Sequence, residues 1–169
     1  MNSISSPQIR LFPDPVLRKK CDQIDHFGNS LEALIRDLIK TMKSQPHGIG
    51  IAAPQIGITQ QVAVVDVSPR VPGSKILILV NPQVLEVRGE KMSREGCMSL
   101  PDYTGNIKRY DFVRLRWQDE NGEFHSKEFN GIEAVCIQHE VDHLNGVIFM
   151  DRVISLKRDM IPRLKASKP

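Results

Sequence analysis

Residues 138–143 have the sequence Gln138-His139-Glu140-Val141-Asp142-His143, which contains an H-E-x-x-H motif. On an α-helix, residues four positions apart lie on the same face, one turn from each other. The side chains of His139 and His143 can therefore bind one metal ion, and Glu140 stands beside the first of them. A carboxylate in that position can take a proton from a water molecule on the metal, which favours hydrolysis of a carbonyl–nitrogen bond.

The composition is that of an ordinary globular protein. The 169 residues are 40% hydrophobic and 25% charged, and a net charge of +3 is too small to argue for nucleic-acid binding. Three cysteines without a secretory signal speak against a disulfide framework, and no stretch approaches the ~20 apolar residues of a membrane span. We expect one domain over residues 1–169, with a tail from about residue 147, in the cytoplasm, where thiols stay reduced.

The spacing of apolar residues predicts an α+β fold. Between residues 31 and 42 leucine, isoleucine and methionine recur at helical spacing, after Asn29 as N-cap. Short β-branched runs predict strands over 61–67, 75–80 and 84–87, and a turn at 120–122 predicts a hairpin between strands 112–118 and 123–129. The H-E-x-x-H helix should begin near Asn130-Gly131 and stop at Asn145-Gly146. This order predicts mostly antiparallel sheet wrapped around a central helix that carries the motif.

A catalytic metal site of this kind requires a third protein ligand, and two cysteines compete for the role. Cys136 shares a helix face with both histidines, but it lies seven residues before His143, about 10 Å along the helix axis. A short side chain with a metal–sulfur bond of ~2.3 Å would struggle to span that distance, so Cys136 fits better as a wall of the site. Cys97 lies in a loop or strand end that can present a thiolate from a separate element. The residues alone leave this choice open.

Three segments together resemble the signature motifs of the peptide deformylase family, in the family's order and with comparable spacing. They are Gly48-Ile49-Gly50-Ile51-Ala52-Ala53-Pro54-Gln55-Ile56-Gly57, Glu95-Gly96-Cys97-Met98-Ser99 and Gln138-His139-Glu140-Val141-Asp142-His143-Leu144-Asn145-Gly146. The first segment also matches a dinucleotide-binding fingerprint, which requires a preceding strand. Here a predicted helix and Pro46 precede it and Pro54 follows, so that interpretation is not favoured.

The resemblance implies a role for each part of the site. Cys97, His139 and His143 would bind one divalent metal ion, with Fe²⁺ expected in the cell and Zn²⁺, Ni²⁺ or Co²⁺ in purified protein. Glu140 would be the general base and then the general acid. The side-chain amide of Gln55 and the backbone N–H of Met98 would donate to the oxyanion of the tetrahedral intermediate.

The implied reaction removes the N-formyl group from the initiator methionine of new polypeptides and releases formate, with a water on the metal attacking the formyl carbonyl. Asp142 or Glu95 would orient a ligand histidine. Arg109 would lie on the rim of the methionine pocket, and Gly50 would pair with the peptide backbone. The residues implied in substrate binding are Gly48, Ile49, Gly50, Arg109, Val135 and Cys136.

The implied partners are N-formylmethionyl nascent polypeptides, with no membrane and no sequence-specific nucleic acid. His47 departs from the family pattern, since many members carry an acidic residue there. The tail is short and basic, and a helix over 155–165 would be interrupted by Pro162, which makes a transient ribosome contact a weak expectation. Two other functions stay open: another small H-E-x-x-H metallopeptidase, and a non-catalytic metal- or peptide-binding module. An intact Glu140 and Gln55 speak against the second.

Overall fold

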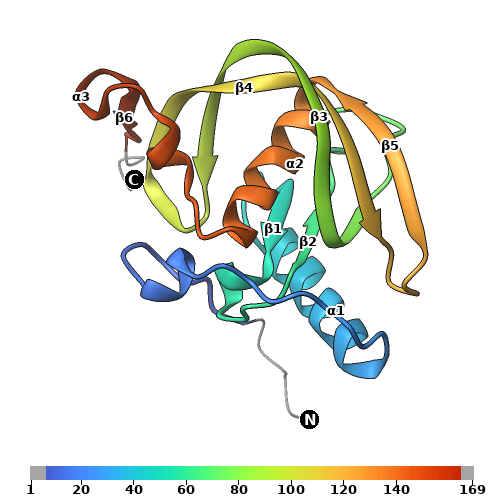
Figure 1. Ribbon diagram of the computed structural model, residues 1–169. Coiled ribbons are helices and arrows are strands. Elements are labelled where there is room, and N and C mark those ends of the chain that lie inside the picture. The colour runs from blue at the N-terminus through green and yellow to red at the C-terminus, as the bar shows by residue number, and fades with distance from the viewer. Residues whose placement is uncertain (1–6, 165–169) are drawn as a thin grey trace.

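The computed structural model describes residues 7–164, in which an antiparallel sheet surrounds one buried helix (Figure 1). The strands follow the order β1-β2-β3-β4-β5, and β6 pairs with β4. The predicted α+β fold, with the sheet wrapped around the motif helix, is confirmed. The elements are η1 (Pro15–Arg18), α1 (Asn29–Ser44), β1 (Gly50–Ala52), η2 (Ala53–Ile56), β2 (Val62–Val65), β3 (Leu77–Cys97), β4 (Leu100–Gln118), β5 (Phe124–Asn130), α2 (Gly131–Leu144), η3 (Phe149–Arg152), α3 (Leu156–Asp159) and β6 (Met160–Pro162).

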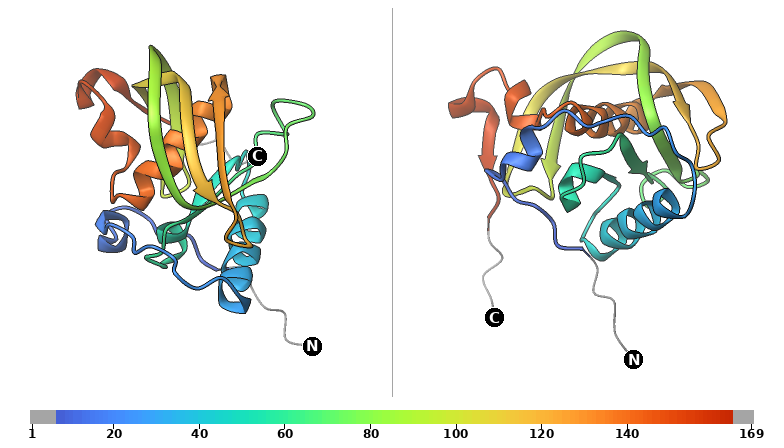
Figure 2. Two further views of the ribbon diagram at one scale, coloured as in Figure 1. Left: turned by 45° about the vertical axis from the view of Figure 1, so that its right-hand side comes forward. Right: turned by 60° about the horizontal axis from the view of Figure 1, so that its bottom comes forward.

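The helix α1 forms where the apolar spacing predicts it, and its apolar stripe packs on β1 and β2. Asn29 is the first helical residue and Gly28 is the N-cap, so the helix begins one residue earlier than predicted. In Figure 2 this helix lies at the end of the molecule away from the arch of β3 and β4. Its buried residues are Leu31, Leu34, Ile35, Leu38, Thr41 and Met42.

The strands β3 and β4 form one long hairpin that arches over α2 (Figure 1). The predicted strands 75–80 and 84–87 fall, apart from residues 75 and 76, within this single strand β3, which continues to Cys97. Shifts in the β3–β4 register between Val80 and Gln83 and between Val84 and Glu86 mark bulges, which bend a strand and increase its twist. The stretch 88–95 was missed because it is largely polar, and cross-strand pairing with β4 holds it in place.

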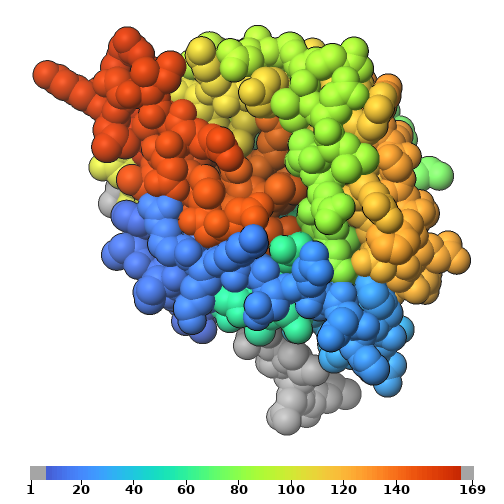
Figure 3. Space-filling model, viewed as in Figure 1, coloured from blue at the N-terminus to red at the C-terminus, as the bar shows by residue number. Residues whose placement is uncertain are grey.

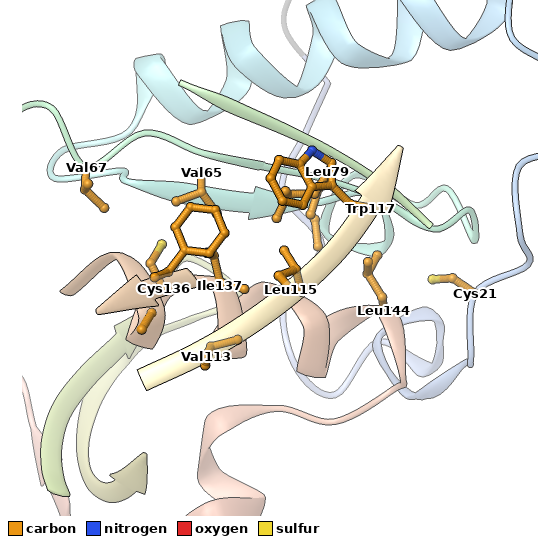
Figure 4. Packing of buried hydrophobic residues seen from close by; sticks show 14 residues of the cluster. Cys21, Val65, Val67, Leu79, Val113, Leu115, Trp117, Cys136, Ile137 and Leu144 are labelled. Atoms are coloured by element: carbon orange, nitrogen blue, oxygen red, sulfur yellow. The ribbon is translucent and has the colours of Figure 1, made fainter. Parts of the chain in front are cut away.

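The helix α2 lies at the centre, and nine of its 14 residues are buried. Ile137 packs among side chains from β2, β3, β4 and β5, including Val65, Leu79 and Leu115 (Figure 4). Gln138 fixes the rotation of the helix, because its Oε1 accepts from the Tyr110 N–H at 3.0 Å and its Nε2 donates to the Tyr110 carbonyl at 2.7 Å. The Gln138 side chain thus satisfies both backbone hydrogen-bonding groups of Tyr110 and holds α2 to β4.

The segments at both ends of the described chain meet on one face of the molecule (Figure 3). Arg18 forms an ion pair with Asp151 of η3, and the Cys21 N–H donates to the Leu144 carbonyl at 2.9 Å. These contacts tie the N-terminal segment to the end of α2.

As expected, no continuous helix runs over 155–164, and the helix that forms there ends at Asp159, before Pro162. The helix α3 spans only four residues, and β6 then pairs with Tyr103, Thr104 and Gly105 of β4. Pro162 suits this edge position because it has no N–H to donate. Lys165 and Lys168 of the basic tail lie outside the described residues. No helix within 7–164 is long and apolar enough to cross a membrane.

Gly146, just after α2, offers a test of how tightly the helix end is held. Its φ of +73° favours glycine, and a Cβ there would lie 2.5 Å from the Arg18 carbonyl oxygen. Gly73 has a φ of +88° with nothing within 4 Å, so it shares the conformation without the close approach. We expect Gly73→Ala to lower the free energy of unfolding by about 1–2 kcal/mol and Gly146→Ala to lower it by about 1–3 kcal/mol more. Equal losses in urea denaturation would contradict the packing described.

Candidate active site

Three potential metal ligands converge between the end of β3 and the middle of α2. The ligand atoms of Cys97, His139 and His143 all lie within 4.8 Å of one another, and Cys97 Sγ is 3.2 Å from His143 Nε2. Cys136 is outside this group: its thiol lies 3.4 Å from the Ile49 carbonyl oxygen, on the wall of the adjoining cleft. Of the two cysteines that the sequence left in competition, Cys97 is the one that lies with both histidines.

The electrostatics of the trio suit a thiolate. Burial raises the pKa of the Cys97 thiol, but the facing His143 and His139 rings outweigh this and hold the pKa well below its ordinary value. A thiolate and two imidazoles form a donor set typical for Zn²⁺, Fe²⁺, Co²⁺ or Ni²⁺. The convergence of three such donors in a buried position fits a bound transition-metal ion.

A buried ion-pair network stands behind the trio. Glu95 accepts from Arg109 through both carboxylate oxygens, at 2.8 and 3.0 Å, and its Oε2 lies 2.8 Å from His139 Nδ1. This contact leaves Nε2 of His139 free to bind a metal. Burial raises the pKa of Glu95, but the hydrogen bonds from His139 and Arg109 outweigh it and lower the pKa to about 2. Of the two acids considered for orienting a histidine, Glu95 makes the contact.

Asp142 has a different role. Its Oδ2 accepts from Arg109 Nη1 at 2.6 Å and from Arg152 Nε at 2.8 Å, so it joins α2 to β4 and η3 through ion pairs. Arg109 itself is only 3% exposed and does not line the cleft that adjoins Cys97, His139 and Cys136. Its predicted position on the rim of the methionine pocket is therefore wrong, because its guanidinium forms ion pairs with the buried carboxylates of Glu95 and Asp142.

Glu140 follows the first ligand histidine and is 3% exposed. Within the described residues its Oε2 has no hydrogen-bond partner, so one carboxylate oxygen is available to a reactant. A Cβ at Gly50 would collide with Oε1 of this carboxylate and with the Cys136 thiol, so glycine is required there. Burial raises the pKa of Glu140 to about 7, although the nearby histidines lower it. A carboxylate with this pKa can both accept and donate a proton near neutral pH.

The side chain of Gln55 is held by hydrogen bonds at both of its ends. The Ala52 N–H donates to Oε1 at 3.0 Å, while Nε2 lies 3.2 Å from Ser99 Oγ and 3.5 Å from Cys97 Sγ. The amide therefore presents its NH₂ group toward Cys97. Met98 comes directly after Cys97, and its half-buried side chain packs against the cluster formed by α1, β1 and β2.

A cleft of about 860 Å³ adjoins these groups and contains most of the predicted substrate residues. His47 is exposed at its edge. The sequence analysis missed several lining residues because tertiary structure alone brings them here: Arg70, Lys91, Met92, Ser93, Arg94, Ile132 and Arg163. The predicted residues in the lining are Gly48, Ile49, Gly50, Gln55, Cys97, Met98, Val135, Cys136, His139 and Glu140.

Two arginines of β4 offer a comparison between a buried and an exposed ion-pair network. Arg109 pairs with Glu95 and Asp142 in the interior, and Arg114 pairs with Glu86 and Glu128 at the surface. We expect Arg109→Ala to lower the free energy of unfolding by about 3–5 kcal/mol, because it removes the guanidinium from the buried Glu95 and leaves Asp142 with Arg152 as its cationic partner. Arg114→Ala should cause a much smaller loss. Denaturant unfolding at matched metal content measures both, and similar losses would contradict the network's importance.

Comparisons with known proteins agree with this geometry. A family model described as polypeptide deformylase matches residues 7–159. A peptide deformylase of Thermodesulfovibrio yellowstonii is 40% identical over 153 residues, which are 90% of this chain and 92% of the relative. One of Heliobacterium modesticaldum is 46% identical over 140 residues, with 83% and 89% covered.

Solved structures give the same result. A peptide deformylase from Thermotoga maritima superposes with a TM-score of 0.83 at 37% identity, covering 89% of this chain and 99% of that one. The Synechococcus elongatus enzyme in complex with actinonin also has a TM-score of 0.83 at 37% identity, covering 89% and 82%. With the family match over most of its length, the chain belongs to the polypeptide deformylase family.

Proposed function

We propose that this chain removes the N-formyl group from the N-terminal methionine of newly synthesised polypeptides and releases formate. Deformylation of N-terminal formyl-methionine is the function of the family to which the chain belongs. The observation that carries the proposal is the buried Glu140 carboxylate beside the trio of Cys97, His139 and His143, with the amide NH₂ of Gln55 directed toward the same point. We also propose that the enzyme acts in the cytoplasm, where thiols stay reduced.

The family is metal-dependent, and we propose Cys97, His139 and His143 as the ligands of one divalent ion. The donor set suits Fe²⁺, which we propose for the cell, and equally Zn²⁺, Ni²⁺ or Co²⁺ in purified protein. When bound, such an ion supplies Lewis acidity, which makes water a stronger acid and polarises a carbonyl group.

Different groups transfer the proton and stabilise the oxyanion. Glu140 accepts the proton of the attacking water and then gives it to the departing amine nitrogen, which a pKa of about 7 permits in both directions. The Gln55 Nε2 and the Met98 N–H donate to the oxyanion as it develops. Because the Ala52 N–H holds Oε1 of Gln55, the amide cannot turn its own carbonyl toward that negative charge.

Substrate binding uses the rest of the cleft. We propose that Ile49, Val135 and Cys136 contact the methionine side chain, since they line the cleft beside Glu140. Burial raises the pKa of the Cys136 thiol well above its ordinary value, so this wall remains neutral and apolar. Gly50 lies on β1, whose only strand partner is β2 within the described residues, so the other edge can pair with an extended peptide backbone.

Glu140→Gln tests the proposal most simply. We expect turnover of a formyl-methionyl peptide to fall by about 10²- to 10⁴-fold, because the amide cannot accept the proton, while the metal content stays unchanged. Glu133→Gln provides a control on the same helix, since Glu133 does not line the cleft. Formate release is measured on anaerobically prepared protein, with an acetylated peptide alongside.

Other outcomes would redirect the assignment. Unchanged turnover in Glu140→Gln would remove Glu140 from the mechanism. Cleavage of internal peptide bonds without formate release would point to a small metallopeptidase instead. No reaction of the metal-loaded protein with any peptide would favour a non-catalytic module.

A further inference from the structure

The entrance of the catalytic cleft is cationic. Arg70, Lys91, Arg94 and Arg163 line it, whereas the carboxylates in its lining are Glu95 and Glu140, both buried at its base. Lys91 pairs with Asp111, and Arg94 Nε donates to the Thr104 hydroxyl at 3.2 Å. Among residues 7–164 neither Arg70 nor Arg163 has an acidic partner, so these two exposed guanidinium groups remain available to a ligand.

Arg163 reaches the cleft through a fixed backbone. The pairing of β6 with β4 ends at Pro162, and the Arg163 N–H then donates to the Asp102 carbonyl at 2.8 Å. Its guanidinium lies against Gly96, where a Cβ would collide with Nη2. Gly96 directly precedes Cys97, and neighbouring Cα atoms are about 3.8 Å apart. Arg163 and Cys97 therefore line the same cleft, with the guanidinium against the residue that precedes the proposed metal ligand.

This arrangement is not implied by the signature motifs. The family match ends at residue 159, so Arg163 belongs to the part of the chain beyond it. If the proposed function holds, the formyl group lies at Cys97 and Glu140, and the remaining peptide leaves through the entrance. An extended chain advances about 3.3 Å per residue, and the arginines line the same cleft as Cys97 and Glu140, so we take the first two residues after the methionine as the ones that reach them.

We propose that Arg163, together with Arg70 and Arg94, makes the enzyme prefer substrates with a carboxylate side chain within two residues after the formyl-methionine. A guanidinium binds a carboxylate through two parallel hydrogen bonds, which fixes both its position and its charge. A lysine at the same place in the substrate is repelled by the cationic entrance. The inference rests on the proposed deformylase function and adds the substrate class.

The experiment compares amidated peptides, which lack a terminal carboxylate, with glutamate, glutamine or lysine one or two positions after formyl-methionine. We expect kcat/KM for the preferred glutamate position to exceed that for lysine by about tenfold or more, and the ratio to shrink as salt rises. Arg163→Gln should reduce the glutamate-to-lysine ratio severalfold, and Arg163→Lys should reduce it less. The ratio is taken within each variant, so a general loss of active enzyme cancels.

Arg158→Gln is the matched control, since Arg158 pairs with Asp159 and does not line the cleft; its ratio should equal that of the wild type. A wild-type ratio near one, or an unchanged ratio in Arg163→Gln, would overturn the inference while turnover of the glutamine peptide keeps the deformylase assignment. Failure of the metal-loaded wild type to act on any of the peptides would overturn both.

Discussion

The hydrogen-bonded chain from Arg109 through Glu95 to His139 is the interaction on which the site depends. A carboxylate that leaves water for a protein interior is strongly destabilised unless an opposite charge and donors meet it. Arg109 supplies two donors to Glu95, and the remaining capacity of Glu95 fixes the ring of His139. Because Glu95 lies two residues before Cys97 on β3, one strand end carries both the orienting acid and the thiolate.

The same network explains why a helix with so many polar groups can be buried. The ion pairs of Asp142 with Arg109 and Arg152 anchor the polar side of α2 to β4 and η3. Ile137 packs into the apolar core, and Gln138 binds the backbone of Tyr110. The helix is thus fixed from several directions, which sets the positions of its histidines.

Local sequence patterns predicted those elements whose apolar residues recur at the spacing of a buried helix face or strand face. The helix α1, the β4–β5 hairpin and the bounds of α2 follow from apolar spacing and turn residues, and helix geometry alone argued against Cys136 as a ligand. The roles of Gln55 and Met98 came from the family resemblance. The polar half of β3 escaped prediction because its order depends on pairing with β4 rather than on burial.

Contacts between residues far apart in the sequence could not be predicted from local patterns. The resemblance placed Arg109 on the rim of the methionine pocket, whereas Glu95 and Asp142, 14 and 33 residues away along the chain, hold it in the interior. Arg163 gave no local signal at all, since only the pairing of β6 with β4 carries it to the cleft. The positions of these two arginines were not predicted, because they depend on partners that no local pattern reveals.

X-ray absorption spectroscopy of the metal-loaded protein tests the central claim most directly. The proposed site predicts one sulfur at about 2.3 Å and two imidazole nitrogens, with loss of the sulfur signal in Cys97→Ser and none in Cys136→Ser. Two sulfur ligands, or a sulfur signal that depends on Cys136, would contradict the assignment of Cys97, His139 and His143 as the metal site.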